Sequence, residues 1–186
     1  PAPMMVLLKQ KHNSKIHPMN PLLSLAITFL IITGCSLIDP PQVAPPFTID
    51  LYSTTDHTER DVFNLDQRKG SPTFINFWFP SCPPCVAEMP QLNKFYLEHK
   101  NDVDVVAVQL IGLDSMEDGQ KFANEKSIDF AVGPDTTGKV SVDYQISVYP
   151  TTIFVDSKGN IADYWQGEIN AEELKQKLTD IQKYED

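Results

Sequence analysis

Two cysteines, Cys82 and Cys85, are separated by two prolines and lie between an apolar run and a segment with helical periodicity. Such spacing occurs in three kinds of site: a disulfide staple, half of a metal site, and a reactive dithiol. In a reactive dithiol, the thiolate of one cysteine attacks a partner's disulfide, and the second cysteine then resolves the mixed disulfide. The residues around the pair decide between the three.

The sequence offers little support for a metal site or a staple. A structural zinc site needs four ligands, but the chain has no second cysteine pair, and His57 and His99 are isolated from each other and from the motif. A disulfide between Cys82 and Cys85 would close a very short loop and constrain the unfolded chain little. We therefore predict a reactive dithiol with no metal and no dissociable cofactor, because the dithiol itself carries the electrons.

The segments that must position this dithiol alternate between strand and helix patterns. Strands are predicted at 47–51, 59–65, 72–79, 103–110, near Phe130, at 151–156 and at 161–167. Helices are predicted at 83–98, 117–127 and 139–144, and from an N-cap at Asn170 to about Tyr184. This order predicts an α/β fold with a central mixed sheet, helices on both faces and an N-terminal β-hairpin.

Cys82 is thereby placed between a central strand and the N-terminus of a helix. Unpaired backbone N–H groups and the helix dipole favour a thiolate there, so Cys82 is the expected nucleophile. Cys85 lies three residues further on the same helical face and is the expected resolving thiol. Pro83 and Pro84 remove two donors that could stabilise the Cys82 thiolate, which favours a more reducing pair.

The N-terminal segment has the layout of an export signal. Three lysines precede the apolar run 22–33, and ITGC at 32–35 looks like a lipobox, whose cysteine is lipidated. We predict a signal peptide or signal anchor at 1–34, a lipidated Cys35 with a proline-rich linker at 35–46, and a folded domain at 47–186. The domain would then work outside the cytoplasm, attached to the membrane.

The charge of the chain limits its partners. The formal net charge is −10, and beyond residue 34 the chain has 12 basic and 25 acidic residues. An acidic surface argues against nucleic acid and against electrostatic binding to anionic lipid. Membrane attachment would therefore depend on the N-terminal anchor alone.

Two motifs together resemble a known family. NFWFPSCPPCVAEMP, followed some sixty residues later by VYPTTIFVDSKGN, resembles the TlpA/ResA group of membrane-anchored thiol-disulfide oxidoreductases, a branch of the thioredoxin superfamily with a redoxin domain. The resemblance runs from about Pro46 to the C-terminus. It implies a thioredoxin-like fold, with Cys82 as the attacking thiol, Cys85 as the resolving thiol and Pro90 as a kink in the active-site helix.

The resemblance also implies a substrate-binding surface. Pro150 would be a cis-proline beside the dithiol, with Tyr149 presenting backbone groups to a peptide; from the residues alone, an ordinary trans turn is preferred. We predict further substrate contacts at Pro83, Pro84 and Trp78.

Glu88 lies one helical turn after Cys85 and is the predicted proton-exchange partner of that thiol, as the resemblance implies. The alternative is a solvated glutamate stabilised by the helix dipole.

Two positions depart from the related pattern. Asn76 stands where thioredoxin has a buried aspartate, and Ser81 stands where much of the family has tryptophan.

The expected function is disulfide exchange with protein substrates, most simply as a reductant in cytochrome c maturation or secretion, with apocytochrome c or secreted proteins as partners and a membrane thiol or electron donor to recharge the pair. A thiol peroxidase is one alternative, although Phe79 replaces the threonine that peroxiredoxins use. A copper chaperone would need wider cysteine spacing and a histidine ligand. A non-catalytic binding lipoprotein would use the same fold as a scaffold.

Overall fold

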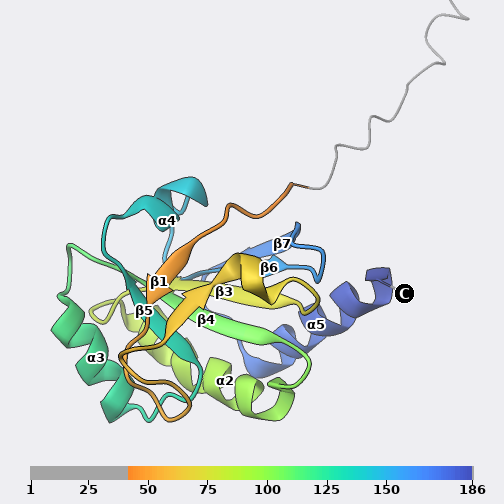
Figure 1. Cartoon of the computed structure of the whole chain (residues 1–186). Helices are drawn as coiled ribbons and strands as arrows, with labels where there is room; N and C mark the ends of the chain where they lie inside the picture. The colour runs from red at the N-terminus through yellow and green to blue at the C-terminus, as the bar shows by residue number, and fades with distance from the viewer. Residues whose placement is uncertain (1–41, 186) are drawn as a thin grey trace, which may run out of the picture. The chain divides into compact units, whose positions relative to one another are not determined.

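A five-stranded sheet in the spatial order β5-β4-β3-β6-β7 forms the centre of the computed structural model, which describes residues 42–185 (Figure 1). Its strands are β3 (Thr73–Trp78), β4 (Asp104–Leu110), β5 (Ala131–Asp135), β6 (Thr151–Val155) and β7 (Ile161–Gln166). Strands β3, β4 and β5 run parallel, whereas β6 is antiparallel to both β3 and β7. The sheet is mixed, as the sequence predicts.

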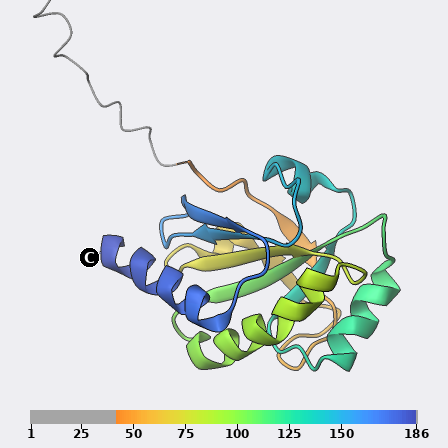
Figure 2. The ribbon, with the colours of Figure 1, turned by 180° about the vertical axis from the view of Figure 1, so that it is seen from behind.

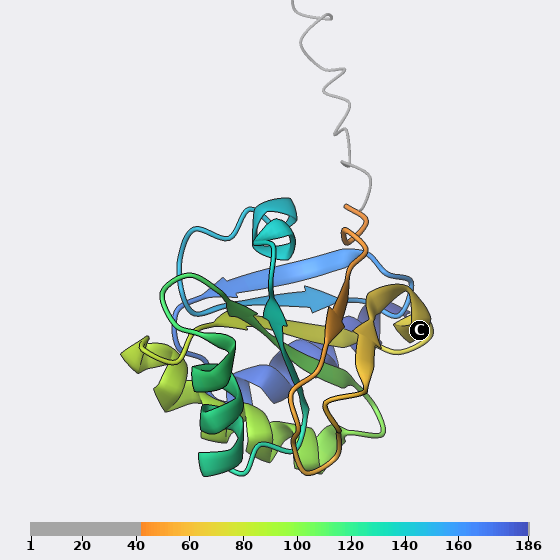
Figure 3. The same cartoon turned by 60° about the vertical axis from the view of Figure 1, so that its left-hand side comes forward.

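Both faces of the sheet are covered. One face, turned toward the viewer in Figure 2, carries α2 (Pro83–His99), α3 (Met116–Glu125) and α5 (Ala171–Glu185). The opposite face carries the 3-10 helix η1 (Leu65–Arg68), the short helix α4 (Lys139–Asp143) and the hairpin of β1 (Thr48–Asp50) with β2 (Val62–Asn64) (Figure 3). The predicted elements are therefore confirmed, with bounds that differ by a few residues.

Strand β3 is buried along its whole length, since all six of its residues are buried. Phe74 stacks on Phe95 of α2 with ring centroids 5.3 Å apart, and it meets the edge of Phe154 of β6 at 4.7 Å. Truncation of such a buried phenylalanine typically costs about 3–5 kcal/mol of stability. The strand that leads to Cys82 is thus fixed by the core on both sides.

The first described residues lie against the β6–β7 hairpin. Val43 forms a bridge with Asn160, and the Ala44 N–H donates to the Gly159 carbonyl at 2.9 Å. Gly159 has φ +86°, which suits a glycine in this turn. Residues 42–46, the end of the predicted linker, are therefore held on the domain.

The predicted N-terminal signal or anchor at 1–34 and the predicted lipidation site Cys35 lie outside the described residues. Within 42–185, none of the helices combines the length and apolar character needed to cross a membrane.

Candidate active site

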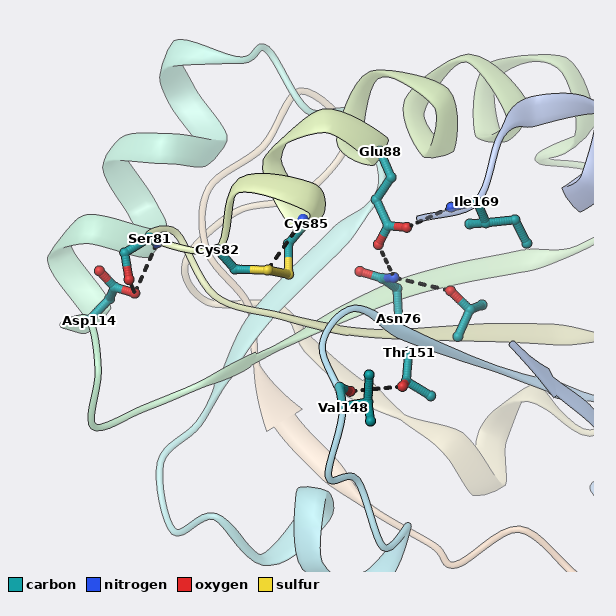
Figure 4. Close-up of a disulfide and its surroundings, with 10 residues drawn as sticks. Asn76, Ser81, Cys82, Cys85, Glu88, Asp114, Val148, Thr151 and Ile169 are labelled. Atoms are coloured by element: carbon teal, nitrogen blue, oxygen red, sulfur yellow. Dashed lines mark hydrogen bonds between the residues drawn. A yellow bond between two sulfur atoms is a disulfide. The ribbon is translucent and has the colours of Figure 1, made fainter. Parts of the chain in front are cut away.

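The two cysteines form a disulfide at the start of α2, with a sulfur–sulfur distance of 2.01 Å (Figure 4). Strand β3 ends at Trp78, and the four residues 79–82 connect it to α2. The last of these four, Cys82, is the N-cap of α2. Cys82 is 4% exposed and Cys85 is fully buried. A partner can therefore reach only the Cys82 side of this pair, which fits its predicted role as the nucleophile.

Within the described part of the chain, few hydrogen-bond donors reach the Cys82 sulfur. Its Sγ accepts the backbone N–H of Cys85 at 3.3 Å. Pro83 and Pro84 occupy the first two positions of α2 and have no N–H to donate. Both prolines are exposed, so they are free to contact a substrate.

Glu88 is fully buried on α2, one turn after Cys85, which excludes the solvated glutamate considered as the alternative. Its Oε1 accepts from Asn76 Nδ2 at 2.7 Å, and its Oε2 accepts from the Ile169 N–H at 3.1 Å (Figure 4). Burial raises the pKa of Glu88 to about 7, against the lowering effect of these two hydrogen bonds, and the charge of Glu168 raises it further. The carboxyl group can thus exchange a proton near neutral pH.

Asn76 connects Glu88 to the neighbouring strand. It pairs in register with Thr152 of β6, and its Nδ2 also donates to Thr152 Oγ1 at 3.1 Å. Its Oδ1 has no hydrogen-bond partner within residues 42–185, although the side chain is fully buried. Asn76 therefore acts as a donor to the carboxylate, since an amide cannot itself exchange a proton.

The Tyr149–Pro150 peptide bond is cis, as the family resemblance implies and against the trans turn preferred from the residues alone. The loop is held by Thr151 Oγ1, which donates to the Val148 carbonyl at 2.8 Å, and by the Gly167 N–H, which donates to the Pro150 carbonyl at 2.8 Å. The Tyr149 ring meets the edge of Phe79 at 5.4 Å, so the loop lies beside the dithiol connection.

The prediction that Trp78 contacts substrate is wrong for this structure. Its side chain is fully buried and packs against Phe122 of α3, with ring centroids 4.8 Å apart. Residues of β3 are covered on both faces of the sheet, so a position close to the motif in sequence does not bring Trp78 to the surface.

Ser81 is held by Asp114, a residue of the loop between β4 and α3 that the sequence analysis did not single out. The Ser81 N–H and hydroxyl both donate to Asp114 Oδ2, at 3.0 and 2.8 Å (Figure 4). The connection that carries Cys82 is thereby fastened to a second loop at the same end of the sheet.

Three contributors to the site were missed: Asp114, Thr152 and the Ile169 N–H. Ile169 is 81 residues from Glu88 and Asp114 is 33 from Ser81, and no local pattern signals either contact. Thr152 could have been found, because it follows the predicted cis-proline at the start of the strand that pairs with β3. Among residues 42–185, there is no group of three or more His, Cys, Asp or Glu side chains able to hold a metal ion.

A cysteine pair at the N-terminus of a helix, with a cis-proline loop beside it and a mixed sheet beneath, defines a dithiol protein of thioredoxin-like fold. Comparison with known proteins agrees. The AhpC/TSA family model matches residues 40–164. Over 180 residues the chain is 32% identical to the thiol-disulfide oxidoreductase ResA of Oceanobacillus iheyensis, covering 93% of this chain and 92% of that protein.

Solved structures give the same result. StoA of Bacillus subtilis is 28% identical with a TM-score of 0.63, covering 74% of this chain and 98% of that chain. A putative thiol:disulfide interchange protein DsbE from Chlorobium tepidum is 26% identical with a TM-score of 0.66, and the match covers 77% of this chain and 97% of that chain. The chain belongs to the AhpC/TSA family and, within it, to the ResA-like thiol-disulfide oxidoreductases. Its general partners are protein disulfides.

Proposed function

We propose that this chain acts as a reductant of protein disulfides outside the cytoplasm. The observation that carries the reducing direction is that Cys82 Sγ accepts one backbone N–H among residues 42–185, that of Cys85. A thiolate at a helix N-cap is stabilised by such donors, and Pro83 and Pro84 supply none. A less stabilised thiolate disfavours the reduced form of the pair, so the reduced protein passes its electrons on more readily.

The proposed reaction has two exchange steps. The Cys82 thiolate attacks the substrate disulfide and forms a mixed disulfide, and one substrate sulfur leaves and takes up a proton. Cys85 then gives its proton to the Glu88 carboxylate and attacks the Cys82 sulfur, which releases the second substrate thiol. With a pKa of about 7, Glu88 can hold and return this proton at neutral pH. No dissociable cofactor takes part.

The surface for the substrate is formed by Tyr149 and Pro150 of the cis-proline loop together with the exposed Pro83 and Pro84. The Tyr149 backbone would pair with an extended peptide beside the dithiol. Apocytochrome c and secreted proteins are the proposed substrates. A membrane thiol or electron donor would recharge the pair, because a reductant outside the cytoplasm has no direct access to cytosolic electrons.

The proposed location depends on the sequence before residue 42. The lysine-flanked apolar run and the ITGC motif support export and attachment to the cell envelope, through a lipid on Cys35 or through an uncleaved anchor. Metabolic labelling with a radioactive fatty acid, with a Cys35→Ala variant as control, tests the lipid.

The redox potential of the pair tests the reducing direction. The full-length protein would be equilibrated in glutathione or dithiothreitol buffers and its thiols counted by alkylation. A transition at or below about −220 mV supports a reductant, and a value near about −120 mV would make the protein an oxidant. Consumption of hydrogen peroxide should be absent, because Phe79 replaces the threonine expected of a thiol peroxidase.

A further inference from the structure

Four chain segments meet around the dithiol: 79–86, 111–116, 145–150 and 166–170. Ser81 joins the first to the second through Asp114, and Phe79 contacts Tyr149 of the third. The third and fourth are joined by the hydrogen bond from Gly167 to Pro150. Figure 4 shows Asp114, Val148 and Ile169 from these segments around the cysteines. We call the four segments together the docking face.

The docking face exposes apolar side chains. Leu113 is 67% exposed, Met116 44% and Val148 43%, and Pro83 and Pro84 of the first segment are exposed as well. Exposed apolar side chains on three of the segments around a reactive disulfide offer contacts to the apolar neighbours of a substrate cysteine.

The only charged residues of the docking face are Asp114 and Glu168, and its four segments contain no lysine or arginine. The seven ion pairs found among residues 42–185 involve neither of them. Both hydrogen bonds from Ser81 end on Asp114 Oδ2, which leaves Oδ1 available to a partner. The docking face therefore carries two acidic groups that form no ion pair with any cation of residues 42–185.

We propose that the docking face selects a cysteine-bearing segment that is apolar next to its cysteine and carries a lysine or arginine that pairs with Asp114 or Glu168. This inference rests on the proposed function and specifies its substrate class. The net charge of −10 also favours such cationic segments, because it attracts cationic partners and repels anionic ones.

Three disulfide peptides test the inference with the reduced full-length protein. Each peptide has one internal disulfide and the same leucine neighbours, and they differ only in carrying Lys, Ser or Glu at two flanking positions. In each reaction the protein dithiol becomes a disulfide and the peptide disulfide becomes two thiols, which alkylation at timed points measures. A small neutral disulfide is the reference.

We expect the Lys peptide to react about tenfold faster than the Glu peptide at low salt, with the Ser peptide between them. The ratio should fall toward one at about 0.5 M salt, because screening removes the electrostatic term. Equal rates for the three peptides, or reaction with the small disulfide alone, would overturn the docking inference and leave disulfide exchange intact. Failure with every disulfide would overturn the proposed function as well.

Charge-neutral variants locate the effect. The pair Asp114→Asn with Glu168→Gln should reduce the Lys to Glu rate ratio to about twofold or less, and the new amide at 114 still offers Ser81 an oxygen. The control pair Glu59→Gln with Glu98→Gln removes two charges as well, at exposed positions outside the docking face, and should keep the ratio. A double variant that retained the full ratio would overturn the assignment to these two residues.

The apolar contribution has its own variant. Leu113→Ser removes an exposed side chain at little cost to packing. It should slow all three leucine-flanked peptides several-fold while the small neutral disulfide reacts as before. Equal slowing of the small disulfide would mean that the change disturbs the dithiol and would count against an apolar contact.

Discussion

The Oε1 atom of Glu88 lies 2.7 Å from Nδ2 of Asn76, so a buried carboxylate on the active-site helix is held by an amide from the central strand. The same carboxylate reaches the backbone of Ile169 just before α5. These two hydrogen bonds fix the Glu88 carboxylate relative to the sheet, the active-site helix and the start of the C-terminal helix. Its proton affinity therefore depends on the packing of all three.

Replacing Glu88 should slow the step in which Cys85 resolves the mixed disulfide. Glu88→Gln keeps the shape and loses the exchangeable proton, so we expect that step to be about tenfold or more slower. Stopped-flow release of a labelled peptide against pH measures it. In the unchanged protein the rate should vary with a midpoint near pH 7, the pKa of Glu88, and the variant should lack that midpoint.

Asn76→Ala is the companion experiment. The hydrogen bond from Asn76 lowers the pKa of Glu88, so its removal should move the midpoint above pH 7 without abolishing it. A midpoint that stayed in place in both variants would assign the titration to another group.

The stability of the oxidised protein should fall as pH rises from about 4.5 to 7. Glu88 has its pKa raised from 4.5 to about 7 by burial, so in this window the folded chain holds a proton that the unfolded chain has lost. The folded state is favoured below the window and loses up to about 3 kcal/mol across it. Urea unfolding at a series of pH values, in the unchanged protein and Glu88→Gln, isolates this contribution, and parallel curves for the two proteins would contradict it.

The two prolines between the cysteines should have different effects when replaced. An N-cap side chain accepts the N–H of the second or third helical residue, and Pro84 is the second. Pro84→Ala should therefore add a donor to the Cys82 thiolate, which then forms at lower pH, and should raise the redox potential by about 30 mV, equivalent to about 1.4 kcal/mol. Thiolate absorbance and glutathione equilibration measure the two effects.

Pro83→Ala is the matched control, because the first helical N–H is not positioned for the N-cap side chain. Equal shifts for both variants would show that the prolines act through backbone stiffness and not through the missing donor.

The roles of the cysteines predict an asymmetric trapping result. Cys85→Ser leaves Cys82, which is 4% exposed, to attack a substrate and should accumulate a stable mixed disulfide on a non-reducing gel. Cys82→Ser leaves only the fully buried Cys85 and should trap little or nothing. Equal trapping by the two variants would reverse or remove the assignment of nucleophile.

The elements that hold the site could be predicted because their signals are local. Periodicity and proline at a first helical position placed α2 within one residue of its observed end, and the N-cap signal at Asn170 is confirmed by its Oδ1, which accepts from both Glu172 and Glu173. The mistaken assignment was Trp78, since its burial depends on α3, which lies some forty residues further along the chain.

The sequence by itself determined the dithiol, its place at the start of a helix and the order of strands and helices, because each depends on neighbouring residues. Tertiary structure alone decided that Glu88 is buried, that Asn76 and Ile169 hold it, and that Asp114 fastens the Cys82 connection. Those contacts join residues between 12 and 81 positions apart, so they exist only once the sheet has assembled. The chemistry of the cysteines is therefore local in origin, whereas the proton affinity beside them is a property of the packed fold.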